Sequence, residues 1–229
     1  MRIKICPSLQ DADLTRLADV VAELEEAGVD GIHVDVADGH FAPNIIFGPY
    51  FARAVASCAS VPVGVHLMIT NPARYAPHFV EAGAEDVLFH GELDADLVEI
   101  ARCIRDAGGR PGAALKPDTD PAVIEPLVGE VDCLMAMTVQ PGFSGQGFME
   151  SACHKIPALR QMFGSDIDIY VDGGIGPDTV GTAVRYGANV MVASSAVFKA
   201  DVPPGEAVRR LREAAEKALE PPMNADERG

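Results

Sequence analysis

Four side chains that can bind metal ions or carry protons stand near the ends of three apolar runs. His33 and Asp35 lie two residues apart in IHVDV, His66 lies in VHLM, and Asp172 follows IYV and precedes two glycines. Alternate residues of a β-strand point to one face, so His33 and Asp35 would share a face. Buried carboxylates need a cation, a proton or water to offset lost hydration. A divalent ion held by all four side chains would meet that need, and a metal-free polar cluster is the alternative. Mixed nitrogen and oxygen ligands suit Zn, Fe(II), Mn or Co better than Mg or Ca.

Elements able to position these side chains alternate along the chain. Short apolar, β-branched runs predict eight strands, at residues 3–6, 31–36, 63–67, 86–90, 112–115, 133–138, 167–171 and 190–193. The amphipathic stretches between and after them predict helices at residues 13–27, 49–58, 72–82, 95–107, 121–128, 151–163, 177–186 and 206–219.

Near-continuous apolar strands alternating with helices are typical of a parallel sheet covered by helices. Eight such units in 229 residues predict a single-domain α/β fold, the closed (β/α)8 TIM barrel, over residues 1–220. An open dinucleotide-binding sheet is the alternative, but no G-x-G-x-x-G follows the first strand. Residues 221–229 are polar and contain proline, and we expect them to form a flexible tail. Active sites of such barrels lie at the C-terminal ends of the strands, where the four side chains stand.

Charge and composition exclude several classes of partner. The chain has 18 Lys and Arg against 34 Asp and Glu, a formal charge of −16, which disfavours binding to nucleic acid. No apolar run approaches the roughly 20 residues of a membrane span, and the N-terminus lacks the apolar core of a signal peptide. Five widely spaced cysteines, an odd number without a CxxC pair, predict reduced thiols and a cytoplasmic protein. Barrels of this size often associate, so a homo-oligomer is compatible with the sequence.

Six segments of the chain resemble the signature segments of ribulose-phosphate 3-epimerases, in the same order and spacing. The segments are CPSL (residues 6–9), HVDVADGHFAPN (33–44), HLM (66–68), MTVQPGFSGQ (137–146), VDGGIGPDT (171–179) and VASSAVF (192–198). They extend over almost the whole chain. The resemblance implies a metal-dependent 3-epimerase that interconverts ribulose 5-phosphate and xylulose 5-phosphate, with Asp35 and Asp172 as the acid–base pair and His33, Asp35, His66 and Asp172 as metal ligands.

The chemistry of epimerisation agrees with this implied pair. Inversion at C3 removes a proton from one face of the carbon and returns one to the other, so it needs two acid–base groups on opposite sides. The second and seventh predicted strands are three steps apart in a ring of eight, roughly 135°, so Asp35 and Asp172 can flank a substrate. A metal chelated by O2 and O3 of the sugar would stabilise the cis-enediolate as a Lewis acid.

The remaining substrate contacts are predicted from loops and from the resemblance. Glycine-rich loops after the last three strands would cradle the phosphate with backbone N–H groups. Their candidate residues are Gly142, Phe143, Ser144, Gly145, Gly173, Gly174, Ser194 and Ser195. The resemblance adds Ser8 and His66 as substrate contacts, and Met68 and Met137 as an apolar cap, although each Met could equally fill the core. The glycine content of residues 142–147 predicts a loop that closes over substrate.

Three departures from the family pattern keep a second sugar open. Ala37 stands where the family usually has a third Met, and Ser144 and Ser194 stand where it usually has Gly. A 3-epimerase of a hexulose phosphate such as allulose 6-phosphate is therefore the nearest rival.

Other classes of function are less favoured. Related decarboxylases and hexulose-phosphate synthases carry D-x-K-x-x-D on the second strand, whereas residues 35–38 here read DVAD. A Schiff-base aldolase would use Lys116, but the following Pro117 and Asp118 favour a solvated turn. A non-catalytic sugar-phosphate-binding barrel is the distant alternative, and it would be marked by loss of Asp35 or Asp172. His40 is predicted to be structural, and His90 is predicted to support the site from behind.

Overall fold

The computed structural model describes residues 2–220, and the predicted tail at 221–229 lies outside the described residues. Eight parallel strands form the wall of a barrel: β1 (Lys4–Pro7), β2 (Ile32–Asp38), β4 (Val63–Met68), β5 (Asp86–His90), β6 (Arg110–Leu115), β7 (Cys133–Met137), β8 (Asp168–Asp172) and β9 (Val190–Ala193). A short strand β3 (Ile45–Ile46) pairs antiparallel with the end of β2. The sheet order is β1-β9-β8-β7-β6-β5-β4-β2-β3. A parallel bridge between Ser8 and His33 joins β1 to β2 and closes the ring.

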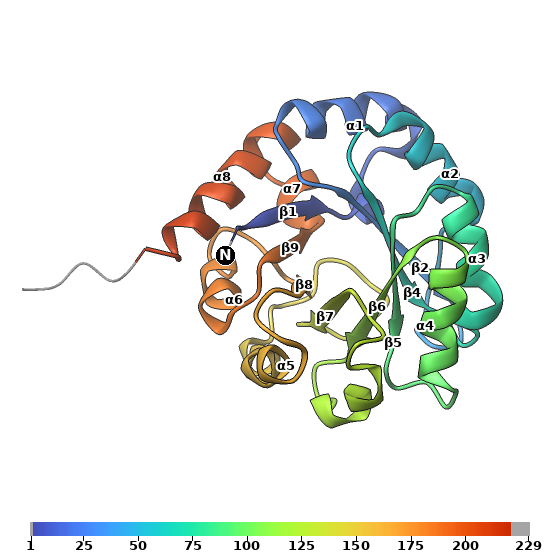
Figure 1. The fold of residues 1–229 in the computed structure, drawn as a ribbon. Helices are drawn as coiled ribbons and strands as arrows, with labels where there is room; N and C mark the ends of the chain where they lie inside the picture. Colours follow the sequence, from blue (N-terminus) through green and yellow to red (C-terminus); the bar gives the residue numbers. More distant parts are fainter. Residues whose placement is uncertain (1, 221–229) are drawn as a thin grey trace, which may run out of the picture.

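Helices surround this ring, as Figure 1 shows. They are α1 (Leu17–Glu26), α2 (Pro49–Cys58), α3 (Pro72–Glu81), α4 (Leu97–Asp106), α5 (Ile156–Phe163), α6 (Val180–Tyr186), α7 (Ser195–Phe198) and α8 (Pro204–Lys217). Short 3-10 segments are η1 (Leu9–Asp11), η2 (Leu14–Arg16), η3 (Pro121–Leu127) and η4 (Glu150–Lys155). The predicted (β/α)8 barrel is confirmed.

Some predicted helix boundaries were wrong, for local reasons. The predicted helix at 121–128 is the 3-10 segment η3, which contains Pro126; proline has no N–H to donate within a helix. The stretch predicted as one helix at 13–27 begins with the 3-10 turn η2, capped by the Asp13 side chain, and only then becomes α1. The helix predicted from residue 177 begins at Val180.

The strand residues divide between two apolar layers. On β4, Val63, Val65 and Leu67 pack outward in the large cluster between strands and helices. On the neighbouring strand, Leu88 belongs instead to a separate cluster inside the barrel, with residues from β1, β6, β7, β8 and β9. Because side chains alternate along a strand, the polar His66 between Val65 and Leu67 must point into the barrel.

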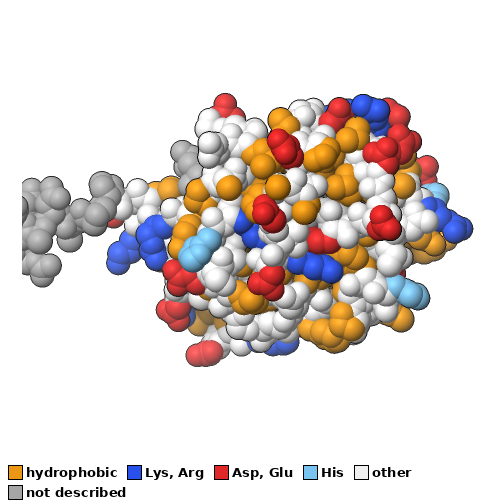
Figure 2. Space-filling model, turned by 90° about the horizontal axis from the view of Figure 1, so that it is seen from below, with side chains coloured by type: hydrophobic (Ala, Val, Ile, Leu, Met, Phe, Trp, Pro, Cys, Tyr) orange, Lys and Arg blue, Asp and Glu red, His pale blue; other side chains and the backbone are white. Residues whose placement is uncertain are grey.

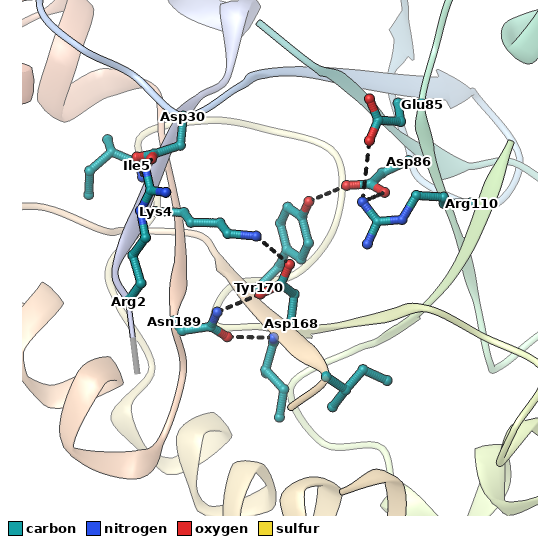
Figure 3. A network of polar contacts seen from close by, with 12 residues as sticks. Arg2, Lys4, Ile5, Asp30, Glu85, Asp86, Arg110, Asp168, Tyr170 and Asn189 are labelled. Carbon is teal, nitrogen blue, oxygen red and sulfur yellow. Dashed lines mark hydrogen bonds and ion pairs between the residues drawn. The ribbon is translucent and has the colours of Figure 1, made fainter. Parts of the chain in front are cut away.

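Charged side chains fill the N-terminal end of the barrel, opposite the strand ends that carry the four candidate residues (Figure 3). Lys4 Nζ is 2.6 Å from Asp168 Oδ2, and the Tyr170 hydroxyl donates to Asp86 at 2.5 Å. Arg110 pairs with Asp86 at 3.1 Å. These contacts join β1, β5, β6 and β8, and so they tie this end of the ring together.

Two composition-based expectations can be compared with the described residues. All five cysteines are free thiols, as the sequence predicted. Within residues 2–220, no helix is both long and apolar enough to cross a membrane. Figure 2 shows Asp and Glu spread over the face that it presents, with Lys and Arg in small separate groups rather than one basic patch.

Candidate active site

The C-terminal ends of three strands bring the four predicted ligands together. His33 and Asp35 come from β2, His66 from β4 and Asp172 from β8. His66 Nδ1 lies 3.2 Å from Asp35 Oδ1 and 3.7 Å from Asp172 Oδ2, and His33 Nε2 lies 3.5 Å from Asp35 Oδ1. One ligand atom from each of the four residues lies within 4.8 Å of all the others. These four side chains can therefore hold one divalent metal ion.

The polar atoms of this cluster fit a cation rather than a self-contained hydrogen-bond network. Both ring nitrogens of His33 are buried without a hydrogen-bond partner, and its 3.5 Å separation from Asp35 is too long for a good hydrogen bond. Two carboxylates face each other across the cluster, with side chains only 6% and 16% exposed. Unpaired buried imidazole nitrogens and apposed carboxylates are both costly unless a positive charge lies between them. The donor set is the nitrogen and oxygen mixture expected for Zn, Fe(II), Mn or Co.

The two carboxylates have different surroundings. Burial raises the pKa of Asp35, but contacts with His33 and His66 outweigh it and hold the net pKa well below the usual range. The Ser8 hydroxyl also donates to Asp35 Oδ2 at 2.5 Å. For Asp172, burial and then the neighbouring Asp35 carboxylate both raise the pKa. The protein itself therefore makes one of the pair the stronger acid, an arrangement typical of paired acid–base groups.

A pocket opens above the two carboxylates at the mouth of the barrel. Its walls contain almost all of the predicted substrate contacts: Ser8, Met68, Met137, Gly142, Phe143, Ser144, Gly145, Gly173, Gly174, Ser194 and Ser195. Asp35 and Asp172 line the same pocket. His66 is fully buried and does not line it, so direct contact between His66 and substrate stays a prediction.

Two glycines that follow β8 have conformations that exclude a side chain. Gly173 has φ +117°, and a Cβ there would lie 2.4 Å from Val139 Cγ2. Gly174 has φ +63°, and a Cβ there would lie 2.6 Å from the backbone nitrogen of Phe148. Positive φ together with such close approach requires glycine. The turn therefore keeps backbone, rather than side chains, at this edge of the pocket.

The loop at residues 142–147 is tied to the opposite rim of the pocket. Asn44 Nδ2 donates to the Gly142 carbonyl at 2.8 Å, and the Ser144 hydroxyl donates to Asp11 Oδ1 at 2.8 Å. Asp11 also donates its backbone N–H to Ser194 Oγ at 3.1 Å, and its carboxylate pairs with Lys199 at 2.6 Å. Ser144 and Ser194 are therefore joined through Asp11.

Sequence reasoning missed several residues around the pocket. Gln10 and Gln146 line it, and Asp11 links its two serine-bearing loops, but none of the three was singled out. Asp11 lies in a polar turn after the first strand, a position at which the sequence alone gives no signal.

The remaining candidates lie outside the pocket lining. His40 contacts the Asp38 carbonyl at 2.9 Å in its own loop, in agreement with a structural role. His90 lies directly behind His66, at 2.9 Å between their Nε2 atoms. Lys116 places its ammonium 4.1 Å from the ring centre of Phe41. Ala37 is buried in an apolar cluster with Ala42, Ile46 and Met68, against which Phe41 and Phe47 pack.

Known proteins share both the sequence and the fold of this chain. The model of the ribulose-phosphate 3 epimerase family matches residues 4–198. A ribulose-phosphate 3-epimerase from Methanocaldococcus jannaschii is 43% identical over 221 residues, which cover 95% of this chain and 93% of the relative. Those from Mycobacterium tuberculosis (41% over 214 residues, 92% of each chain) and Bacillus subtilis (40% over 200 residues, 86% of this chain and 92% of the relative) are similarly close.

Two solved structures share the fold alone. KGPDC from Streptococcus mutans aligns with a TM-score of 0.75 at 13% identity, covering 95% of this chain and 99% of its own. The 3-hexulose-6-phosphate synthase from Salmonella typhimurium aligns with a TM-score of 0.71 at 20% identity, covering 94% and 100%. Identity at this level is too low to transfer an activity. The long match to one family model, and relatives of about 40% identity along most of the chain, settle the relationship: the chain belongs to the ribulose-phosphate 3-epimerase family.

Proposed function

We propose that this protein is a metal-dependent 3-epimerase that interconverts D-ribulose 5-phosphate and D-xylulose 5-phosphate. The observation that carries the proposal is the placement of Asp35 and Asp172. Strands β2 and β8 are separated in the ring by β1 and β9, yet both carboxylates line one pocket and reach one common point. Two acid–base groups on different walls of one pocket are what inversion at a carbon requires.

Each carboxylate has a distinct part in the proton transfers. The carboxylate on one wall takes the proton from C3, and the carboxylic acid on the other wall returns a proton to the opposite face. For the reverse reaction the two exchange roles. The Ser8 hydroxyl donates to the Asp35 carboxylate, which helps to fix its direction toward the pocket. A divalent ion bound by the four side chains would supply Lewis acidity that stabilises negative charge on the substrate oxygens.

Apolar side chains and loop backbone account for the rest of the substrate. Met68 and Met137 present thioethers to the pocket and exclude water from the reacting carbon. Phosphate would bind among the loops around Gly174, Ser194 and Ser195, through backbone N–H groups and hydroxyls. No Lys or Arg lines the pocket among the described residues, so its phosphate affinity would depend on these neutral donors.

Partners and location follow from the proposed activity and the composition. A ketose phosphate is the proposed partner. The absence of nucleic-acid binding, a cytoplasmic location and self-association stay predictions.

Isotope exchange tests the proposed reaction. The enzyme is stripped with a chelator, reloaded separately with Zn²⁺, Mn²⁺, Fe²⁺ and Co²⁺, and incubated in D₂O with ribulose 5-phosphate, xylulose 5-phosphate or allulose 6-phosphate. We expect deuterium at C3 together with epimerisation, a higher kcat/KM for the pentuloses, and loss of both processes after chelation. Preference for the hexulose would identify the rival activity, and inversion without solvent deuterium would contradict proton transfer by the carboxylates.

A further inference from the structure

A buried row of three ionisable side chains runs outward from the candidate metal ligand His66. Its Nδ1 faces Asp35, and its Nε2 lies 2.9 Å from His90 Nε2. On the far side of His90, Nδ1 lies 2.8 Å from Glu92 Oε2. Both imidazoles are 0% exposed and the Glu92 side chain is 16% exposed, so the contact between the two rings is closed to water. The row lies between two acceptor carboxylates, Asp35 at one end and Glu92 at the other, and these two groups favour opposite directions of its hydrogen bonds.

The carboxylate of Glu92 fixes one end of the row. Its other oxygen, Oε1, accepts the backbone N–H of Lys116 at 2.6 Å. A carboxylate can only accept hydrogen bonds, so the proton between it and His90 belongs to His90 Nδ1. A neutral imidazole has one donor and one acceptor nitrogen, which leaves His90 Nε2 as the acceptor. The proton between the two imidazoles then belongs to His66 Nε2.

The far end of the row is the metal-binding nitrogen. With its proton on Nε2, a neutral His66 presents an unprotonated Nδ1 to Asp35 Oδ1 at 3.2 Å and to Asp172 Oδ2 at 3.7 Å, an arrangement that a cation bound between these atoms would satisfy. The opposite polarity would place a proton on Nδ1, where no metal could bind. Ligating imidazoles commonly donate their second N–H to a carboxylate, a carbonyl or water. Here His66 would donate to the imidazole of His90, which in turn donates to the Glu92 carboxylate.

We propose that Glu92 and His90 are positioning residues that favour the Nε2–H tautomer of His66 against the opposing Asp35 carboxylate, and thereby make its Nδ1 available as a ligand. Neither residue lines the substrate pocket, and neither belongs to the group of four ligands. The proposal rests on the proposed function, because it needs a divalent ion at that group. The ring of Phe41, centred 4.5 Å from that of His90, holds the second imidazole in place.

The substitution Glu92→Gln reverses the polarity with almost no change of shape. The Lys116 N–H still needs an acceptor, so the glutamine oxygen must occupy the Oε1 position and its NH₂ group must face His90 Nδ1. The Thr119 hydroxyl that also contacts Glu92 can donate or accept and does not oppose this orientation. His90 must then carry its proton on Nε2, and His66 must carry its proton on Nδ1.

Two measurements follow on the full-length protein, each independent of turnover. Calorimetric titration of the metal-free protein with Zn²⁺ and Mn²⁺ should show an affinity about 10–100-fold weaker for Glu92→Gln than for wild type. Nitrogen-15 spectra of histidine-labelled protein should show His66 as the Nε2–H tautomer in Zn²⁺-loaded wild type, and a larger share of the Nδ1–H tautomer in metal-free Glu92→Gln than in metal-free wild type. Glu125→Gln removes an equal charge from an exposed side chain and should match wild type in both.

A second variant separates polarity from packing. In His90→Gln the amide can accept from His66 Nε2 and donate to Glu92. The hydrogen-bond direction of the wild type is therefore kept, and the variant should retain most of the wild-type metal affinity. If Glu92→Gln binds both metals as tightly as Glu125→Gln and the His66 tautomer is unchanged, the role proposed for Glu92 and His90 is wrong, but the proposed metal site is not contradicted. If the wild type binds no divalent ion, both the role proposed for Glu92 and His90 and the proposed function are wrong.

Discussion

Replacement of Asp172 by Asn tests two effects of the paired carboxylates separately: their contribution to catalysis and their effect on the free energy of unfolding. The substitution keeps the shape of the side chain but removes its ability to take or return a proton. General acid–base catalysis by one group contributes about 10²–10⁴-fold in rate, so kcat should fall by about that factor, which corresponds to an activation barrier about 3–5 kcal/mol higher. The Asp35 carboxylate remains, held by the hydrogen bond from the Ser8 hydroxyl.

The same substitution should stabilise the metal-free protein. Ligand oxygens of Asp35 and Asp172 lie within 4.8 Å of each other, which at an effective dielectric constant of about 20 corresponds to repulsion of about 3.5 kcal/mol or more between two full charges. Partial protonation of Asp172, whose pKa is raised, reduces this figure. We therefore expect metal-free Asp172→Asn to gain about 1–3 kcal/mol in unfolding free energy, or about 2–10 °C in Tm. Added Zn²⁺ should narrow or reverse the difference.

The assay is C3 deuterium exchange followed separately for each epimer, with saturating metal and measured metal content. The variant should still exchange the C3 hydrogen of the one epimer that faces Asp35, without inversion, and should not exchange that of the other epimer. Asp168→Asn, at the opposite end of the same strand, is the matched control and should retain wild-type exchange. Turnover above about 1% of wild type in metal-loaded Asp172→Asn, or equal exchange of both epimers, would refute the two-base reasoning.

Three further perturbations have defined outcomes. Burial raises the pKa of Asp168, but contacts with Lys4 and Asn189 outweigh it and lower the net pKa. Its stabilising contribution is therefore present above the unfolded pKa near 4 and is lost as pH falls through the folded value. Asp168→Asn should cost about 1–2 kcal/mol at pH 7, and its unfolding free energy in urea should fall less steeply than that of wild type as pH drops below about 4. Ser144→Gly removes the 2.8 Å hydrogen bond to Asp11, so limited proteolysis at residues 142–147 should become several-fold faster, with little change in Tm. An unchanged cleavage rate would show that this bond does not restrain the loop. Removing metal with a chelator, from a free concentration of 100 times Kd, should lower the free energy of unfolding by about 2.7 kcal/mol and the Tm by about 5–10 °C. An equal decrease in His66→Ala would show that the metal binds elsewhere.

Short-range pattern was enough for the strands and for the face that each side chain presents. The predicted strands at 86–90 and 190–193 have the observed bounds of β5 and β9, and the helix at 49–58 has those of α2. The two-residue spacing of His33 and Asp35 placed both inside the barrel, as observed. These features depend on alternation and on turn residues a few positions apart, which the sequence displays directly.

Ends of elements were harder where proline or a side-chain cap competes with the regular hydrogen-bond pattern. The helix predicted at 121–128 contains Pro126 and is instead the 3-10 segment η3. The Asp13 side chain caps a 3-10 turn that delays the start of α1. Whether such a residue bends, caps or ends a helix depends on the tertiary contacts of the same turn.

Contacts between distant segments were decided by closure of the barrel. The Ser8–His33 bridge completes the ring and so lets β2 and β8 direct Asp35 and Asp172 toward one point. The row from His66 through His90 to Glu92 exists because β4 and β5 lie side by side in one register. By itself the sequence determined which side chains point inward, because that follows from a local period of two; which inward side chains touch depends on register around the whole ring, which no local period contains.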